Sequence, residues 1–204
     1  MICSINETGA ILRKAAVGSG FPIGLADVIS AAGVWLCVRD LDGIGAVLEV
    51  LDAGYPTSVA ARRNGALITV SHARTGRSGV SLIELLIAGE VERVIIESSD
   101  SIMLLAGMAG VAATNSGVAF AFTIDGESII IDSRRIEASG LSGSSRVEIE
   151  ITEPRLQPFQ PLRSALVVDE EQWESISGLA ARIYVPATEE SRLSGAGAGL
   201  TDND

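Results

Sequence analysis

Apolar residues recur every three or four positions through the first 54 residues, and this period predicts three helices. The first helix begins at Ser4–Glu7, where the hydroxyl and the carboxylate form a capping box that satisfies two backbone donors. The second carries an apolar stripe from Leu25 to Leu36, after Pro22, a residue suited to the first turn of a helix. The third is short and ends at Gly54. We therefore expect a helical N-terminal layer.

The middle of the chain changes to short β-rich runs. Two of them, at 65–71 and 92–97, flank a segment at 80–89 that is typical of a helix ending at a glycine. The clearest hairpin signal spans 118–132, where two β-rich runs flank Asp125-Gly126, a favoured turn pair. Residues 146–152 alternate between apolar and charged side chains, so we expect a half-exposed strand there.

Helices and strands mix without a regular βαβ rhythm, which favours an α+β fold. The expected architecture is an N-terminal helical layer packed on a mixed or antiparallel sheet, with a C-terminal helix that stops at Pro186 and a glycine-rich tail. We expect one domain over 1–185. Its parts are a helical part at 1–54, a sheet-containing part at 65–152, a C-terminal helix at 167–185, and then a Gly/Ala-rich tail at 186–204.

One uncharged segment, Ser101–Ile124, is long enough to span a bilayer. Its centre contains Thr114–Gly117, a helix stop followed by a turn, so two shorter buried elements explain it better. Glu7 interrupts any apolar core of a secretory signal at the N-terminus. The sequence therefore predicts no membrane association.

Composition narrows the functional classes. Hydrophobic residues make up 47% of the chain, enough for a core, and the net charge of −11 argues against nucleic acid as a partner. The two cysteines form no CxxC pair, and with a single histidine no zinc framework is plausible. We expect Cys37 to be a buried free thiol and Cys3 to be exposed, in a reducing, cytoplasmic setting. No motif indicates a cofactor.

A basic segment in this otherwise acidic chain gives the first candidate site. No Asp or Glu occurs from Ala53 to Ile83, whereas this window contains the only histidine and several arginines, of which Arg74 and Arg77 flank the loop after a predicted strand. Such a cluster attracts small anions, and His72, at the strand end, could act as acid or base. The alternative is an ordinary solvated loop with a surface histidine.

The C-terminal segment gives the second candidate site. Arg192, next to Ser191, is the only basic residue after Val185 and could anchor a substrate carboxylate, or else pair with a neighbouring glutamate on the surface. The run GAGAGLTDND follows no strand and opens no helix, which excludes a phosphate-binding glycine loop. It is either a disordered end or an arm that docks over a pocket, a partner or a symmetry mate.

Three segments resemble a known family: SINETGAILRKAAVGSGFPIGLADVISAAGVWL, QWESISGLAARIYVPATEESR and GAGAGLTDND. They are similar to an uncharacterised bacterial family, a domain of unknown function. The matching positions are Glu7, Asp27, Arg192 and the Gly-Ala tail. The resemblance carries over no catalytic role, but it implies that the tail is used.

Two functional hypotheses remain. The first is an enzyme, or an enzyme subunit, of catabolic metabolism that binds a small anion, with His72, Glu7 or Asp27 as weak candidates for a catalytic group. For Glu7 and Asp27 the simpler interpretation is a charge that stabilises the start of a helix. The second hypothesis is a non-catalytic interaction or assembly protein whose tail docks into a partner or another copy of the chain.

Overall fold

A computed structural model describes residues 1–136, 141, 146–154 and 159–184. Six helices are described: α1 (Ile5–Gly18), α2 (Ile23–Cys37), α3 (Gly43–Asp52), α4 (Thr75–Ile87), α5 (Ile102–Ser116) and α6 (Glu170–Ala181). The described strands are β1 (Ile2–Ser4), β2 (Ala61–Asn64), β3 (Leu67–Val70), β4 (Arg93–Ile96), β5 (Ala119–Ile124), β6 (Glu127–Ile131), β7 (Val147–Thr152) and β8 (Ala165–Val167). The α+β prediction is confirmed.

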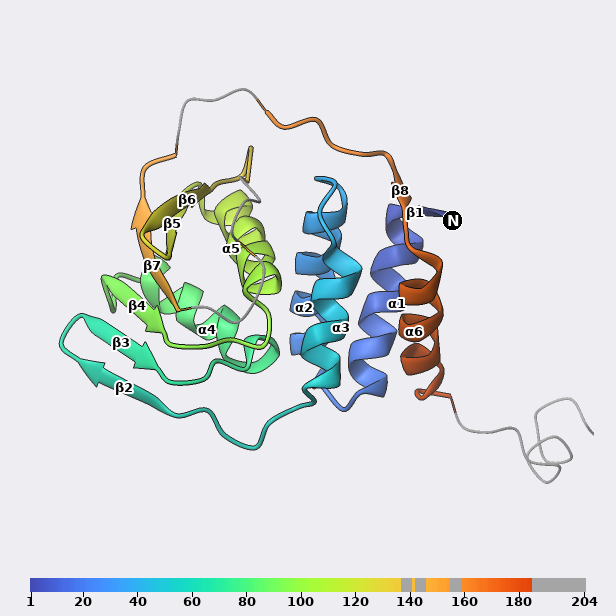
Figure 1. Cartoon of the computed structure of the whole chain (residues 1–204), viewed down its shortest axis with the longest axis horizontal. Helices are drawn as coiled ribbons and strands as arrows, with labels where there is room; N and C mark the ends of the chain where they lie inside the picture. The colour runs from blue at the N-terminus through green and yellow to red at the C-terminus, as the bar shows by residue number, and fades with distance from the viewer. Residues whose placement is uncertain (137–140, 142–145, 155–158, 185–204) are drawn as a thin grey trace, which may run out of the picture.

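The main sheet is mixed. Its six strands lie in the order β2-β3-β4-β7-β5-β6, and only the β3–β4 pair within it is parallel. Helix α4 makes the crossover between these two strands, so the fold contains one βαβ unit. A parallel pair requires such a crossover, and it brings the carboxyl ends of β3 and β4 to the same edge. Strands β1 and β8 form a separate antiparallel pair at the other side of the molecule (Figure 1).

The helices form layers beside this sheet (Figure 1). Helices α4 and α5 contact strands of the sheet, α2 packs on α5, and α1 packs on α2 and α6. The N-terminal helices therefore reach the sheet through α4 and α5. The α2–α5 contact is close because Gly110 has no side chain and leaves room for the Trp35 ring.

The capping box at the start of α1 is confirmed. The backbone N–H of Glu7 donates to Ser4 Oγ at 3.1 Å, and the Ser4 N–H donates to Glu7 Oε2 at 3.4 Å. The apolar face of this helix is buried at Leu12, Ala15 and Ala16. Local polar chemistry and apolar spacing thus agree with tertiary packing in this helix.

The uncharged segment divides as expected. Helix α5 ends at Ser116, and Gly117 has a φ of 76°, a left-handed conformation that costs glycine little. The chain then enters β5, which continues through a turn with positive φ at Asp125 and Gly126 into β6. Among the described residues, no helix has the length and apolar character needed to cross a membrane.

Strand β7 is half exposed, as its alternation predicts. Val147 and Ile149 are buried, whereas Glu148 and Glu150 pair with Arg93 on the outer face of the sheet. This strand lies between β4 and β5, a position that its local sequence does not reveal.

Several expectations need correction. Cys3 is 2% exposed, because β1 pairs with β8 and turns this side chain inward. Helix α4 begins at Thr75, before its apolar run, and α6 ends at Ala181, before Pro186, which lies outside the described residues. The three strands β1, β2 and β8 carry three or four residues each, too few for a periodic signal.

Candidate functional site

The loops that follow β3 and β4 lie side by side. The Ala73 N–H donates to the Ser98 carbonyl at 2.8 Å, and the Asp100 N–H donates to the Ala73 carbonyl at 3.3 Å. A parallel bridge between Ala73 and Ser99 extends the pairing of the two strands into the loops. Helices α4 and α5 begin immediately afterwards, at Thr75 and Ile102. The carboxyl ends of two parallel strands and two helix N-termini therefore meet at one edge, here called the strand-end site.

A buried hydroxyl network holds this edge together. Thr75 Oγ1 donates to the Ser101 carbonyl at 3.1 Å and accepts from Ser99 Oγ at 2.9 Å. Ser101 Oγ accepts from the Leu104 N–H at 3.2 Å and caps α5. Thr75, Ser99 and Ser101 are all buried, so their hydroxyls need these partners. The network makes the strand-end site a rigid frame.

His72 lies at the exposed rim of this frame. Its Nδ1 is 2.7 Å from Ser98 Oγ, and Ser98 Oγ lies 3.1 Å from the Ser71 carbonyl, to which it donates. Because the serine hydroxyl has a single proton, directed at the carbonyl, the imidazole must donate from Nδ1. Neutral His72 then has its lone pair on Nε2. An exposed Nε2 in this tautomer is able to accept a proton or a metal ion.

Arg74 is anchored by its surroundings. Its Nη2 donates to the Gly54 carbonyl at 2.8 Å and to the Ala53 carbonyl, and its Nε lies 3.3 Å from Asp100 Oδ2. Asp100 Oδ1 in turn accepts from the Thr75 N–H at 2.8 Å, at the start of α4. Arg74 therefore ties the segment after α3 to the strand-end site.

Arg77 also contacts the segment after α3, but its charge is not paired with a carboxylate of the described residues. Its Nη1 donates to the Pro56 carbonyl at 2.5 Å, and its guanidinium lies 5.3 Å from the centre of the Tyr55 ring. A carbonyl and an aromatic face leave the cationic charge in place. Among the described residues, Arg77 forms no ion pair with a carboxylate.

The structure places two of the predicted site residues in contact with the loop after β4: His72 contacts Ser98, and Arg74 pairs with Asp100. Arg77 follows in the first turn of α4 and contacts Tyr55 and Pro56 instead. Glu7 caps α1 on the side of the molecule away from the sheet (Figure 1), and Asp27 pairs with Arg13 on the exposed surface of α1 and α2. Ser191 and Arg192 lie outside the described residues.

Sequence reasoning missed the second half of the strand-end site. Ser98 and Asp100 stand 26 and 25 residues after their partners His72 and Thr75 in the chain. The signal that would have found them is their place directly after a β-rich run, since the loops after two parallel strands lie at one edge.

No group of three or more His, Cys, Asp or Glu side chains within the described residues is placed to hold a metal ion.

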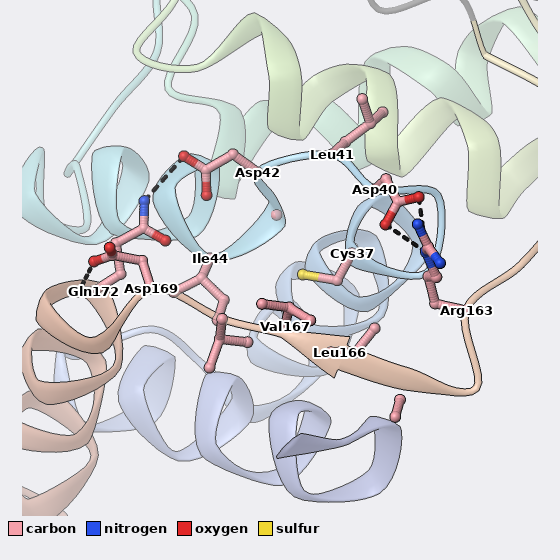
Figure 2. A pocket seen from close by; sticks show the side chains of 13 residues that line it. Cys37, Asp40, Leu41, Asp42, Ile44, Arg163, Leu166, Val167, Asp169 and Gln172 are labelled. Atoms are coloured by element: carbon pink, nitrogen blue, oxygen red, sulfur yellow. Dashed lines mark hydrogen bonds and ion pairs between the residues drawn. The ribbon is translucent and has the colours of Figure 1, made fainter. Parts of the chain in front are cut away.

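A pocket of about 610 Å³ lies at the other side of the molecule, between the α2–α3 turn and β8 (Figure 2). Cys37 and Ile44 contribute apolar surface, while Asp42 and Asp169, the N-caps of α3 and α6, contribute carboxylates. Gln172 bridges the two caps: its Nε2 donates to Asp42 Oδ2 and its backbone N–H to Asp169 Oδ1, both at 3.0 Å. Sequence reasoning did not identify this pocket, because its walls come from segments far apart in the chain.

Cys37 is expected to be a poor nucleophile. Burial raises the pKa of the Cys37 thiol from 9.0 to about 11, an effect that the Asp42 charge reinforces and the backbone N–H groups of Gly43 and Ile44 oppose. At pH 8 its thiolate fraction is then about 100-fold below that of an ordinary thiol, which should slow alkylation by iodoacetamide to a similar degree. The alkylation rate is measured on a Cys3→Ala variant, in which Cys37 is the sole thiol. The rate of the native variant is compared with that of the same variant unfolded in urea.

The same shift predicts the direction of a pH effect on stability. Between about pH 9 and pH 11 the unfolded chain releases the Cys37 proton while the native protein keeps it, so the native state loses stability as the pH rises. A Cys3→Ala/Cys37→Ser variant should lack this part of the pH dependence. Equal alkylation rates in the native and unfolded chains at pH 8 would contradict the raised pKa.

The N-terminal part of the chain matches a known family. Residues 3–85 match a family model described as Protein of unknown function (DUF3726). The resemblance to a domain of unknown function is thereby confirmed. The DUF3726 match runs from β1 to near the end of α4 and includes His72, Arg74 and Arg77. Ser98 and Asp100 lie beyond the matched residues.

No curated protein matches the chain. Three of the solved structures that are similar to it have identities of 12–15% with the chain. Malate dehydrogenase from Pyrococcus horikoshii OT3 has 12% identity and a TM-score of 0.44, and the match covers 61% of this chain and 40% of the dehydrogenase. Malate dehydrogenase from Entamoeba histolytica has 12% identity and a TM-score of 0.46, and the match covers 81% of this chain and 49% of the dehydrogenase. Sulfolactate dehydrogenase from Methanocaldococcus jannaschii has 15% identity and a TM-score of 0.46, and the match covers 64% of this chain and 45% of the dehydrogenase. The chain spans less than half the length of each of these proteins.

Proposed function

We propose that the protein binds a small anionic molecule at the strand-end site and that His72 is the acid–base group that acts on it. The observation that carries this proposal is the His72 Nδ1–Ser98 Oγ hydrogen bond of 2.7 Å, formed beside the carboxyl ends of the two parallel strands. In sheets with parallel strands, ligands bind outside these ends, where loops rather than strands supply the side chains.

The charge around the strand-end site supports an anionic ligand. Helices α4 and α5 begin there, and neither has an acidic residue in its first turn. The Asp100 carboxylate offsets part of the positive end of the α4 dipole, because it accepts the Thr75 N–H, whereas α5 is capped by the neutral Ser101 hydroxyl. Arg77 adds a cationic charge that no carboxylate of the described residues neutralises. The charge of Arg74 is largely offset by Asp100, and its side chain links the segment after α3 to the strand-end site.

The tautomer of His72 supports a role in proton transfer. With Nδ1 donating to Ser98, Nε2 is the atom that would accept a proton from a bound molecule, and the resulting imidazolium would keep its Nδ1–H on the serine. Ser98 then orients the ring. It is not a nucleophile in this arrangement, because its own proton is directed at the Ser71 carbonyl and not at a base.

A proton NMR titration tests this proposal, because His72 is the only histidine and its Hε1 signal is unique. Inorganic phosphate and malonate should each shift this signal in a saturable way, since a bound anion changes the charge next to the imidazole ring. At ten times its dissociation constant, the anion should also stabilise the protein by about 1.4 kcal/mol.

Arginine variants provide the matched control. Arg77→Gln should weaken the saturable shift about tenfold, whereas Arg13→Gln, which removes the same charge from the α1–α2 surface, should leave it unchanged. The proposal fails if phosphate and malonate act no differently from sodium chloride at equal ionic strength. It fails equally if the Arg13 variant loses as much as the Arg77 variant.

A further inference from the structure

Within the described residues, the outer edge of β8 presents backbone groups without partners. Met1 and Val168 exchange two hydrogen bonds, of 2.9 and 3.0 Å. In an antiparallel pair, hydrogen-bonded and non-hydrogen-bonded positions alternate, so Leu166 bonds toward β1 while Ala165 and Val167 direct their N–H and C=O groups away from it. Within the described part of the chain, no backbone or side-chain group bonds to these two residues.

This edge forms one wall of the 610 Å³ pocket (Figure 2). The pocket is bounded at one end by Arg163, whose N–H donates to the Val38 carbonyl at 2.8 Å and whose Nε contacts both Asp40 carboxylate oxygens at 2.7 and 2.8 Å. At its other end Gln172 bridges to Asp42 at 3.0 Å. Between these contacts β8 offers three residues, a length of about 10 Å at the usual rise of a strand.

The carboxylates of Asp42 and Asp169 favour a positively charged ligand in this pocket. Asp42 accepts from the Gly45 N–H at 2.8 Å and from Gln172, and Asp169 accepts one backbone N–H at 3.0 Å. A carboxylate has about four acceptor positions, so both groups can accept further donors. Cys37 is a neutral thiol at neutral pH because its pKa is raised to about 11. An ammonium group therefore suits the Asp42–Asp169 end.

We propose that this pocket binds the amino-terminal end of a short extended peptide, with its ammonium group at Asp42 and Asp169 and its backbone paired with Ala165 and Val167. Strand addition at a sheet edge and capture of a terminal amine are established ways in which proteins recognise peptides. A pocket of this volume accommodates about three residues beside the apolar surface of Cys37 and Ile44. The chain's own residues 201–204 are a poor occupant, because two of the four are aspartates and the pocket end is lined by carboxylates. This site is independent of the strand-end site.

Binding is tested with the tripeptide Ala-Val-Ala carrying a C-terminal amide. In ¹⁵N-labelled protein, saturable shifts are expected at the backbone amides of Ala165 and Val167, because both N–H groups gain an acceptor. The N-acetylated peptide, which lacks the ammonium charge, should bind at least tenfold more weakly. A peptide N-methylated at its central residue should also bind more weakly, since it loses a donor to β8.

Variants separate the charge from the fold. Asp42→Asn and Asp169→Asn keep a side chain that caps a helix equally well but remove the charge, so the double variant should fold and lose at least tenfold in affinity. Glu174→Gln, an exposed charge on α6 that does not line the pocket, should change nothing. Equal binding of the acetylated peptide, tight binding of butylamine alone, or no amide shift at Ala165 and Val167 at millimolar peptide would each overturn the proposal.

Discussion

Replacing Gly110 with alanine is expected to lower the free energy of unfolding by about 2–3 kcal/mol, the upper range for overpacking a well-filled core. A Cβ at this position would overlap the Trp35 ring, with three ring atoms as its nearest neighbours. The ring has little room to move, because it is 7% exposed and the Arg39 guanidinium stacks on it, 3.7 Å from the centre of the ring. Urea unfolding followed by far-ultraviolet circular dichroism measures the loss.

Gly178→Ala is the matched control for this substitution. Gly178 lies within α6, and a Cβ there meets no atom within 4 Å. Since glycine is unfavourable inside a helix, the control should stabilise the protein by about 0.5–1 kcal/mol. Equal effects of the two substitutions would show that Gly110 does not set the close packing of α2 on α5.

The second large effect is expected at Arg39, which is 5% exposed at the end of α2. Its Nη1 donates to the Trp35 carbonyl at 3.0 Å and its Nη2 to the Ser133 carbonyl at 3.1 Å. Burial lowers the pKa of Arg39 to about 10, against the opposing charge of Asp132, so the side chain remains a cation at neutral pH but is poorly solvated. Arg39→Met should cost about 3 kcal/mol, because it removes a buried cation whose charge acts on buried Asp132 and leaves the Trp35 and Ser133 carbonyls without these donors.

A double-mutant cycle separates charge from packing at this position. Asp132 is 4% exposed and accepts the backbone N–H groups of Arg134 and Arg135 at 2.7 and 2.9 Å, which asparagine can also accept through its side-chain oxygen. The double variant Arg39→Met/Asp132→Asn should therefore be more stable than Arg39→Met alone. Strictly additive losses would mean that Arg39 acts through its hydrogen bonds and its stacking on Trp35, without coupling to Asp132.

Much of the local structure follows from short stretches of sequence. The capping box at Ser4–Glu7, the turn at Asp125-Gly126 and the glycine stop at Gly117 each depend on bonds or backbone angles within a few residues. The strands β1, β2 and β8 have no such local signal, because their stability comes from a partner strand.

For the strand-end site too, local sequence indicated some residues, whereas their contacts depend on segments far apart in the chain. The absence of acidic residues between Ala53 and Ile83 made His72, Arg74 and Arg77 candidate site residues, and their role stays a prediction. In the structure His72 contacts Ser98, Arg74 pairs with Asp100, and Arg77 contacts Pro56. The sequence did not indicate that both arginines hold backbone carbonyls of residues 53–56, nor that Ser98 orients the histidine. Both facts depend on contacts between residues that are 20 to 26 positions apart in the chain.

By itself the sequence determined the N-terminal helices, the hairpin, the α+β class and the place of the basic residues along the chain, since each depends on periodicity, turn chemistry or charge within a short window. Only the tertiary structure decided which loops meet. Parallel pairing of β3 with β4 brings His72 next to Ser98, and antiparallel pairing of β1 with β8 leaves the outer backbone edge of Ala165 and Val167 along the wall of a pocket. Strand pairing over long distances depends on the burial of whole surfaces, and no short window of the sequence contains that information.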